Sequence, residues 1–158
     1  MSQQKLTTIT LREAGLKLAE QDGRPLCRDV LHKRSQIYLS QSGHRIRLRT
    51  TNDRVLTVTA SSTKPAEATL DFEDCCVLLL VMPTERRGTS AVEAYWVPST
   101  DAARDVKTAH QRWLDSNPNT KSANKTYSIW FDEAMAESGM FREKWSQYRL
   151  PATLRLSE

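Results

Sequence analysis

An unbroken apolar run, Cys75–Met82, constrains the fold of this chain more than any other feature of its sequence. The run is far shorter than the ~20 residues that a membrane-spanning helix needs. Because it is apolar at every position rather than at alternate ones, both faces of the segment must be covered. The pattern therefore predicts a central strand of a sheet with other elements packed on both sides.

Short strands and amphipathic helices are predicted around this run. Period-two alternation bounded by turn residues indicates strands over 37–39, 44–50, 55–59, 92–97 and 126–131. Apolar side chains spaced three or four residues apart indicate helices between Thr10 and Gly23 and over 24–34, 101–114 and 132–145. We expect an α/β or α+β fold with a mixed central sheet of about five strands, flanked by helices on both sides.

The 158 residues are the length of a single domain. Its expected parts are an N-terminal helical pair over 1–34, a strand-rich core with one helix over 35–114, and a C-terminal strand and helix over 115–158.

Two local patterns set the expected connections within this domain. Thr10 and Glu13 match a capping box that begins the first helix. Asn52–Asp53 is expected to turn the strand over 44–50 back onto the strand over 55–59 as its partner.

The cysteines and histidines do not have the spacing of a metal site or of a disulfide framework. They are Cys27, Cys75, Cys76, His32, His44 and His110. We expect no metal and no cofactor, and free thiols together with a polar N-terminus favour a cytoplasmic protein without a membrane segment. Composition excludes the disulfide-rich secreted, fibrous and disordered classes.

Basic and acidic side chains are unevenly distributed along a chain of formal net charge +4. Residues 35–65 carry five basic side chains and one acidic one, whereas residues 66–105 carry three basic and eight acidic ones. Because a basic surface attracts phosphates through counterion release, this asymmetry indicates a polyanion as one class of partner.

The strand predicted over 44–50 presents three arginines on one face, namely Arg45, Arg47 and Arg49. Alternate strand residues lie about 6.6–6.8 Å apart, which suits successive phosphates, and each guanidinium fork binds a phosphate through two hydrogen bonds. Arg54 and Lys64 would extend this track. The other interpretation is an exposed strand face whose arginines aid solubility and discourage edge pairing.

Three acidic residues, Asp71, Glu73 and Asp74, lead into the central strand. Asp71 and Glu73 are expected on one face, and paired carboxylates are typical ligands of Mg²⁺. A solvated lead-in to the buried strand is the simpler interpretation. As an acidic edge, the three residues are also candidates for an interface with a protein partner.

Aromatic and basic side chains alternate between Lys121 and Arg149, a pattern that suits base stacking or protein docking. Phe141, Trp145 and Tyr148 have helical spacing, which favours packing against the sheet. We keep Trp145 and Tyr148 as candidate protein-interface residues.

The strand order resembles the restriction-endonuclease-like PD-(D/E)XK core over roughly Leu11 to Leu114. The resemblance rests on the acidic start of the central strand at Asp71, the strand that ends in Tyr95-Trp-Val-Pro98, and Glu13 on the first helix.

The resemblance implies an active site that this chain lacks. In active members a turn supplies Asp, and the next strand supplies Asp/Glu-x-Lys for the metal. Here that motif falls on Arg47-Leu48-Arg49, and the segment 37–42 contains no Asp. Arginine repels the dication that such a site holds, so the resemblance implies a catalytically inactive copy.

Three function classes follow from these patterns. The first is a non-catalytic nucleic-acid-binding domain, with DNA favoured over RNA, that uses the arginines. The second is a protein-interaction module, such as an accessory, immunity or antitoxin-like subunit. The third is a metal-dependent nuclease that uses Asp71 and Glu73. A helix-turn-helix variant of the first would place Arg28, Lys33 and Arg34 on DNA.

Overall fold

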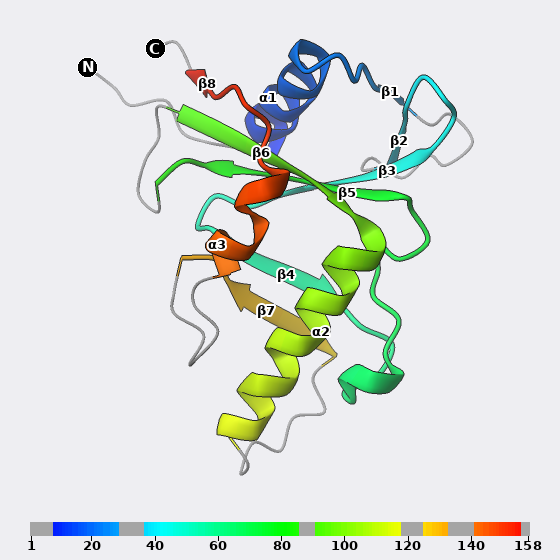
Figure 1. Ribbon diagram of the computed structural model, residues 1–158, viewed down its shortest axis with the longest axis vertical. Helices are drawn as coiled ribbons and strands as arrows, with labels where there is room; N and C mark the ends of the chain where they lie inside the picture. The colour runs from blue at the N-terminus through cyan, green and yellow to red at the C-terminus, as the bar shows by residue number, and fades with distance from the viewer. Residues whose placement is uncertain (1–7, 29–36, 86–90, 118–124, 133–140, 156–158) are drawn as a thin grey trace.

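The computed structural model describes residues 8–28, 37–85, 91–117, 125–132 and 141–155 (Figure 1). In chain order the elements are α1 (Thr8–Gln21), β1 (Cys27–Arg28), β2 (Ile37–Leu39), β3 (Arg45–Thr50), β4 (Val55–Thr59), the 3₁₀ turn η1 (Pro65–Glu67), β5 (Val77–Pro83), β6 (Ala91–Pro98), α2 (Ser99–Ser116), β7 (Thr126–Trp130), α3 (Phe141–Trp145), the 3₁₀ turn η3 (Ser146–Tyr148) and β8 (Leu154–Arg155).

Residues 77–82 of the apolar run lie in β5, the strand at the centre of a mixed sheet, whereas Cys75 and Cys76 precede it. Six strands of the described chain make up this sheet in the order β1-β2-β3-β5-β6-β8. β5 runs parallel to β3 and antiparallel to β6, and Leu78–Met82 is completely buried. The prediction of a mixed-sheet, single-domain α+β fold is confirmed.

β5 is covered on both faces, as the apolar run requires, so the fold has three layers with the sheet in the middle. α1 lies on one face, where Leu11, Ala14 and Leu18 pack against Leu79 and Val81. α2, α3 and a separate two-stranded sheet lie on the other face (Figure 1). None of the helices in the described ranges is both long and apolar enough to cross a bilayer.

The first helix ends where the sequence predicts but begins earlier. Gly23 has a φ of +77° and donates to the carbonyl of Glu20, while Arg24 donates to that of Ala19, so glycine terminates the helix in a Schellman motif. α1 includes Thr8, so Thr10 lies inside its first turn and the predicted N-cap at Thr10 is wrong.

α1 and β5 approach each other closely at Gly15. A Cβ atom added to Gly15 would overlap the Cγ2 atom of Val81. We expect Gly15→Ala to lower the free energy of unfolding by about 1–2 kcal/mol, because overpacking outweighs the gain in helix propensity. In urea denaturation the Gly15→Ala change should cost nothing in a Val81→Ala background. A Gly15→Ala variant as stable as the wild type contradicts this packing.

β4 does not pair with β3, so the predicted hairpin is wrong. Both edges of β3 are occupied, one by β2 and the other by β5. β4 instead pairs with β7, with Val58 opposite Tyr127. The alternation within β4 is as predicted, since Leu56 and Val58 are buried.

The second predicted helix, 24–34, is wrong where the structure describes it. Cys27–Arg28 forms β1, which pairs with β2. This strand replaces the helix that would have carried Arg28 into a DNA groove, and Lys33 and Arg34 lie outside the described residues. Of the last predicted helix, 132–145, the described part is α3, a short helix at its C-terminal end.

Candidate anion-binding site

The three arginines of β3 share one face of the sheet, as their spacing predicts. Ile46 and Leu48 point the other way and are buried beneath α1. Arg45, Arg47 and Arg49, hereafter the arginine row, are each partly buried. Because β3 is an interior strand, the interpretation that these arginines discourage edge pairing is wrong.

Residues 71–74, hereafter the acidic turn, place one carboxylate against each end of the arginine row. Arg45 pairs with Asp74 at 3.3 Å, and Arg49 pairs with Asp71. The row is therefore not the open stripe that the sequence predicts, since two of its three guanidinium groups have carboxylate partners.

Arg47, in the middle of the row, has no such partner. No hydrogen bond or ion pair joins its side chain to the rest of the described chain. In addition, the Nε atoms of all three arginines are buried and have no hydrogen-bond partner in the part of the chain that the structure describes. One oxygen of Asp71 is likewise buried without a partner among the described residues. Each buried polar atom without a partner costs about 1–3 kcal/mol, so the face of the arginine row is not fully satisfied within the fold.

The acidic turn is not part of the central strand. β5 begins at Val77, and the amides of Glu73 and Cys75 donate to the carbonyls of Leu70 and Phe72. The side chain of Phe72 is completely buried and anchors the turn. Asp71 and Glu73 therefore do not alternate on a strand, which corrects that expectation.

Both carboxylates that a nuclease would use are held by contacts within the fold. Asp71 pairs with Arg49 and accepts the amide of Thr59 at 3.0 Å. Glu73 accepts the amide of Leu70 and pairs with Lys107 at 3.3 Å. This arrangement places a cation beside each carboxylate, where a second cation would be repelled.

A groove lies next to Arg49, at the C-terminal end of the arginine row. It is lined by four threonines, by Asn52 and Asp53, and by the apolar residues Leu11, Val55 and Leu56; the threonines are Thr50, Thr51, Thr57 and Thr59. Threonine hydroxyls bind phosphate oxygens in nucleic-acid complexes. The hydroxyl of Thr51 already donates to Asp53 at 2.6 Å, so the other three threonines are the neutral donors that the groove adds beside Arg49.

Arg54 does not extend the arginine row, which corrects a predicted site residue. Its side chain is 2 % exposed. The residue lies in the turn between β3 and β4, where its backbone has a φ of +60°. It donates to Glu93 at 2.7 Å, to both oxygens of Asp132 and to the carbonyl of Pro83. Burial lowers the pKa of Arg54, but these two carboxylates raise it overall, so the charge is fixed.

Glu93 completes this buried cluster and was missed by the sequence reasoning. It also accepts the hydroxyl of Tyr95 at 3.1 Å, and burial and Glu93 together raise the pKa of Tyr95 to about 12. The sequence does contain a signal for this buried role, because Glu93 is the sole charged residue in the apolar segment 91–98. Such an acid needs a buried cation. The cluster joins β4, β6 and β7, so its role is structural.

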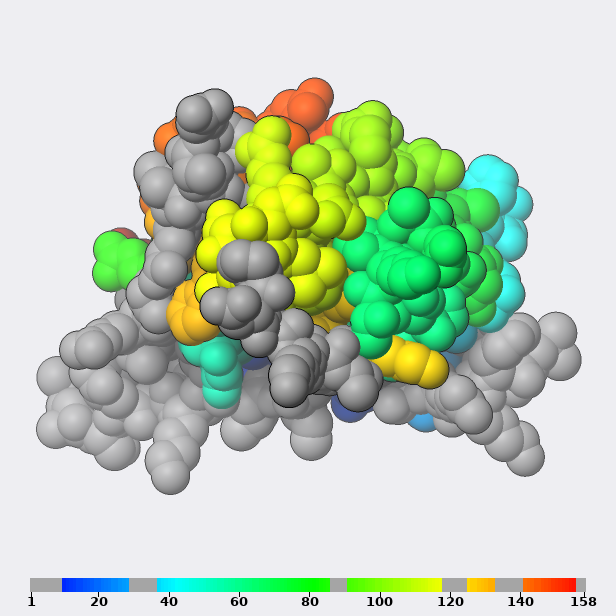
Figure 2. All heavy atoms as spheres, turned by 90° about the horizontal axis from the view of Figure 1, so that it is seen from below, coloured from blue at the N-terminus to red at the C-terminus, as the bar shows by residue number. Residues whose placement is uncertain are grey.

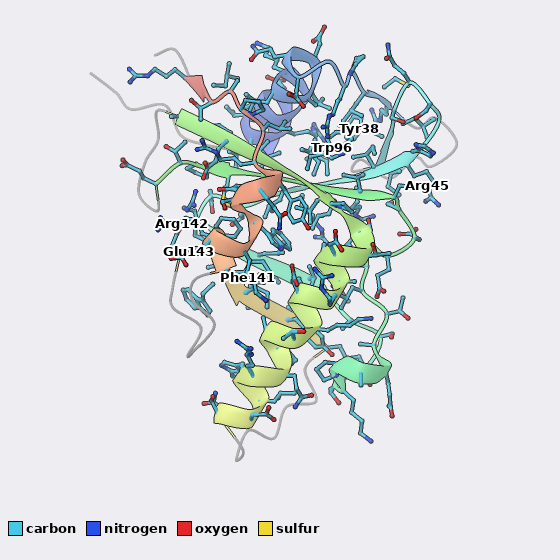
Figure 3. All side chains as sticks on the ribbon, in the orientation of Figure 1. Tyr38, Arg45, Trp96, Phe141, Arg142 and Glu143 are labelled. Carbon is cyan, nitrogen blue, oxygen red and sulfur yellow. The ribbon has the colours of Figure 1, made fainter. Side chains whose placement is uncertain are left out.

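The remaining candidate residues do not converge on the row. Lys64 is exposed and precedes η1, which packs against α2 (Figure 1). Figure 2 views this end of the molecule and shows η1 beside the C-terminal end of α2. In Figure 3, Arg45 projects from the edge of the molecule at the start of β3.

The two aromatic candidates for a protein interface differ in exposure. Trp145 is completely buried against Phe141 and donates to Asp105 at 2.9 Å, so it belongs to the core and that expectation is wrong. Tyr148 is half-buried and donates to Asp101 at 3.0 Å. Of the acidic candidates, Asp74 is exposed, whereas Asp71 and Glu73 are partly buried.

The described cysteines and histidines lie in separate environments. Cys75 is buried, while Cys27 and Cys76 are exposed. His44 contacts Ser42, and His110 stacks on Tyr127 with ring centroids 3.7 Å apart. Among the described residues, no group of three or more His, Cys, Asp or Glu side chains is placed to hold a metal ion. His32 lies outside the described residues.

The Cys75 thiol is expected to be unreactive in the folded protein. Burial and the neighbouring Asp74 raise its pKa to about 11. At pH 8 a maleimide should label Cys27 and Cys76 rapidly and Cys75 only after unfolding, which peptide mass spectrometry after timed labelling would measure. Equal labelling of Cys75 and Cys76 in the folded protein would contradict the burial of this thiol.

No protein-family model matches the sequence, and the searches of curated proteins and of solved structures also found no match.

Proposed function

We propose that this protein is a non-catalytic nucleic-acid-binding domain that holds backbone phosphates at the arginine row, with DNA as the preferred partner. The observation that carries the proposal is Arg47, a partly buried arginine in the centre of the row without a carboxylate partner among the described residues. A phosphate supplies the acceptors that the terminal nitrogens of this guanidinium lack.

The local charge balance supports an anionic ligand. Arg45, Arg49 and Lys107 each pair with one carboxylate of the acidic turn, and Arg47 adds a fourth cation, which leaves one net positive charge. The threonine-lined groove beside Arg49 gives a phosphate backbone a path away from the row.

A binding role suits these residues better than hydrolysis. Asp71 and Glu73 are each held by a cation. If the resemblance to the PD-(D/E)XK core holds, the arginines of β3 replace the metal-binding carboxylates of its active members. Kinship with that family remains a prediction, and the proposal does not depend on it. The free state of all three thiols supports a cytoplasmic location as part of the proposal.

The test is a binding titration with fluorescently labelled single-stranded and duplex DNA at about 50–200 mM salt. We expect Arg47→Gln to weaken binding about tenfold, because it removes a charge-assisted hydrogen bond to a phosphate. The slope of log K against log salt should fall by about 0.7–0.9 for each phosphate that the variant no longer neutralises.

Arg24→Gln is the matched control, since it removes the same charge from an exposed arginine that pairs with Asp22 at the end of α1. It should change the affinity less than twofold. Absent or salt-independent DNA binding would overturn the proposal and favour the protein-interaction alternative. Equal losses of affinity in the two variants would overturn the assignment to the arginine row.

A further inference from the structure

The two ion pairs at the ends of the arginine row differ in how firmly they are held. Arg49 and Asp71 have side chains only 22 % and 18 % exposed, and Asp71 is also fixed by the amide of Thr59. Asp74, by contrast, is 58 % exposed and meets Arg45 through one contact of 3.3 Å. Its other oxygen accepts only a weak bond from the thiol of Cys75, at 3.7 Å.

Arg45, Arg47 and Asp74 belong to one local environment. The charges of all three act on the thiol of Cys75, the carboxylate raising its pKa and the two guanidinium groups lowering it. Arg45 and Arg47 are alternate residues of β3 and so lie about 6.6–6.8 Å apart on the same face. A carboxylate that contacts Arg45 therefore occupies one of the two guanidinium groups that a phosphate bound to both arginines needs.

We propose that Arg45 and Arg47 form the phosphate site of this protein and that Asp74 is an internal competitor, which must release Arg45 before a phosphate binds. This inference rests on the proposed nucleic-acid binding and adds a competing group within the same site. An exposed ion pair contributes little, whereas a phosphate offers a guanidinium two charge-assisted hydrogen bonds, so the exchange favours the ligand. Asp71 is held more firmly than Asp74, so Arg49 keeps its carboxylate partner when a phosphate binds to Arg45 and Arg47.

The test compares the full-length wild type with Asp74→Asn, using the same labelled DNA strands. Removal of the competitor should tighten binding about fivefold, the factor that corresponds to the upper range for an exposed ion pair. Because Asp74 is exposed, the variant should fold, and a thermal melt checks this. In an Arg45→Gln background, Asp74→Asn should give little or no gain.

Asp22→Asn is the matched control, because it makes the same change in net charge and releases Arg24 from an ion pair of similar length, 3.1 Å. Equal gains in Asp74→Asn and Asp22→Asn, or a full gain without Arg45, would overturn the competitor role. In those cases binding by the wild type and weaker binding by Arg47→Gln would leave the proposed function intact. If neither the wild type nor Asp74→Asn binds, the proposed function fails as well.

Discussion

Replacing Arg54 with methionine is expected to lower the free energy of unfolding by about 3–5 kcal/mol. Methionine approximates the volume of the arginine stem, so the loss comes from charge rather than from a cavity. Without Arg54, Glu93 retains only the more distant Arg149, at 3.4 Å, and Tyr95, and Asp132 loses its closest cation. An uncompensated buried carboxylate is among the costliest defects that a fold can contain.

Urea denaturation at pH 7 measures this loss, with Arg24→Met as the control. Arg24 pairs with Asp22 on the surface, where its side chain is 45 % exposed, so its replacement should cost no more than about 1 kcal/mol. Similar costs for the two variants would show that the Arg54 cluster does not hold β4 and β7 against the main sheet.

Replacing Trp145 with alanine is expected to cost about 3–5 kcal/mol, the range for large aromatic residues of a core. The indole ring is completely buried, with its centroid 4.5 Å from that of Phe141 and 6.2 Å from that of Phe131. Its Nε1 atom also donates to Asp105 at 2.9 Å, so alanine removes a hydrogen bond as well as volume.

Trp113→Ala is the matched control for this variant, since Trp113 is 44 % exposed at the end of α2. Its replacement should change the stability by less than about 1 kcal/mol. If Trp145→Ala were as stable as Trp113→Ala, the indole would not be a core residue, and the interpretation of Trp145 as a docking residue would return.

Local patterning in the sequence predicts much of this fold. The continuous run over 75–82 identifies the central strand, because no other arrangement in a sheet buries both of its faces. Alternation identifies β3 and β4, since each has one buried face. Gly23 marks the end of α1, because its positive φ suits glycine.

Strand pairing is the part that local patterning does not predict. A turn such as Asn52–Asp53 is compatible with a hairpin, but β3 already has two neighbours, and only the complete sheet reveals this. Ion pairs between residues that are distant in sequence cannot be predicted from local patterns for the same reason. Arg54 and Asp132 meet across the fold, and so do Arg45 and Asp74. The sequence therefore predicts which residues are charged but not which charges neutralise one another.

The central claim is that phosphates bind at the arginine row, and side-chain NMR of the arginine Nε–Hε groups tests it most directly. On addition of DNA, the signals of Arg45 and Arg47 should shift and exchange more slowly with solvent, because a phosphate bound to the terminal nitrogens holds each guanidinium group in place. The signal of Arg54, whose Nε already donates to Asp132, should not change and serves as the internal reference. Binding of DNA that leaves the Arg45 and Arg47 signals unchanged would contradict the claim.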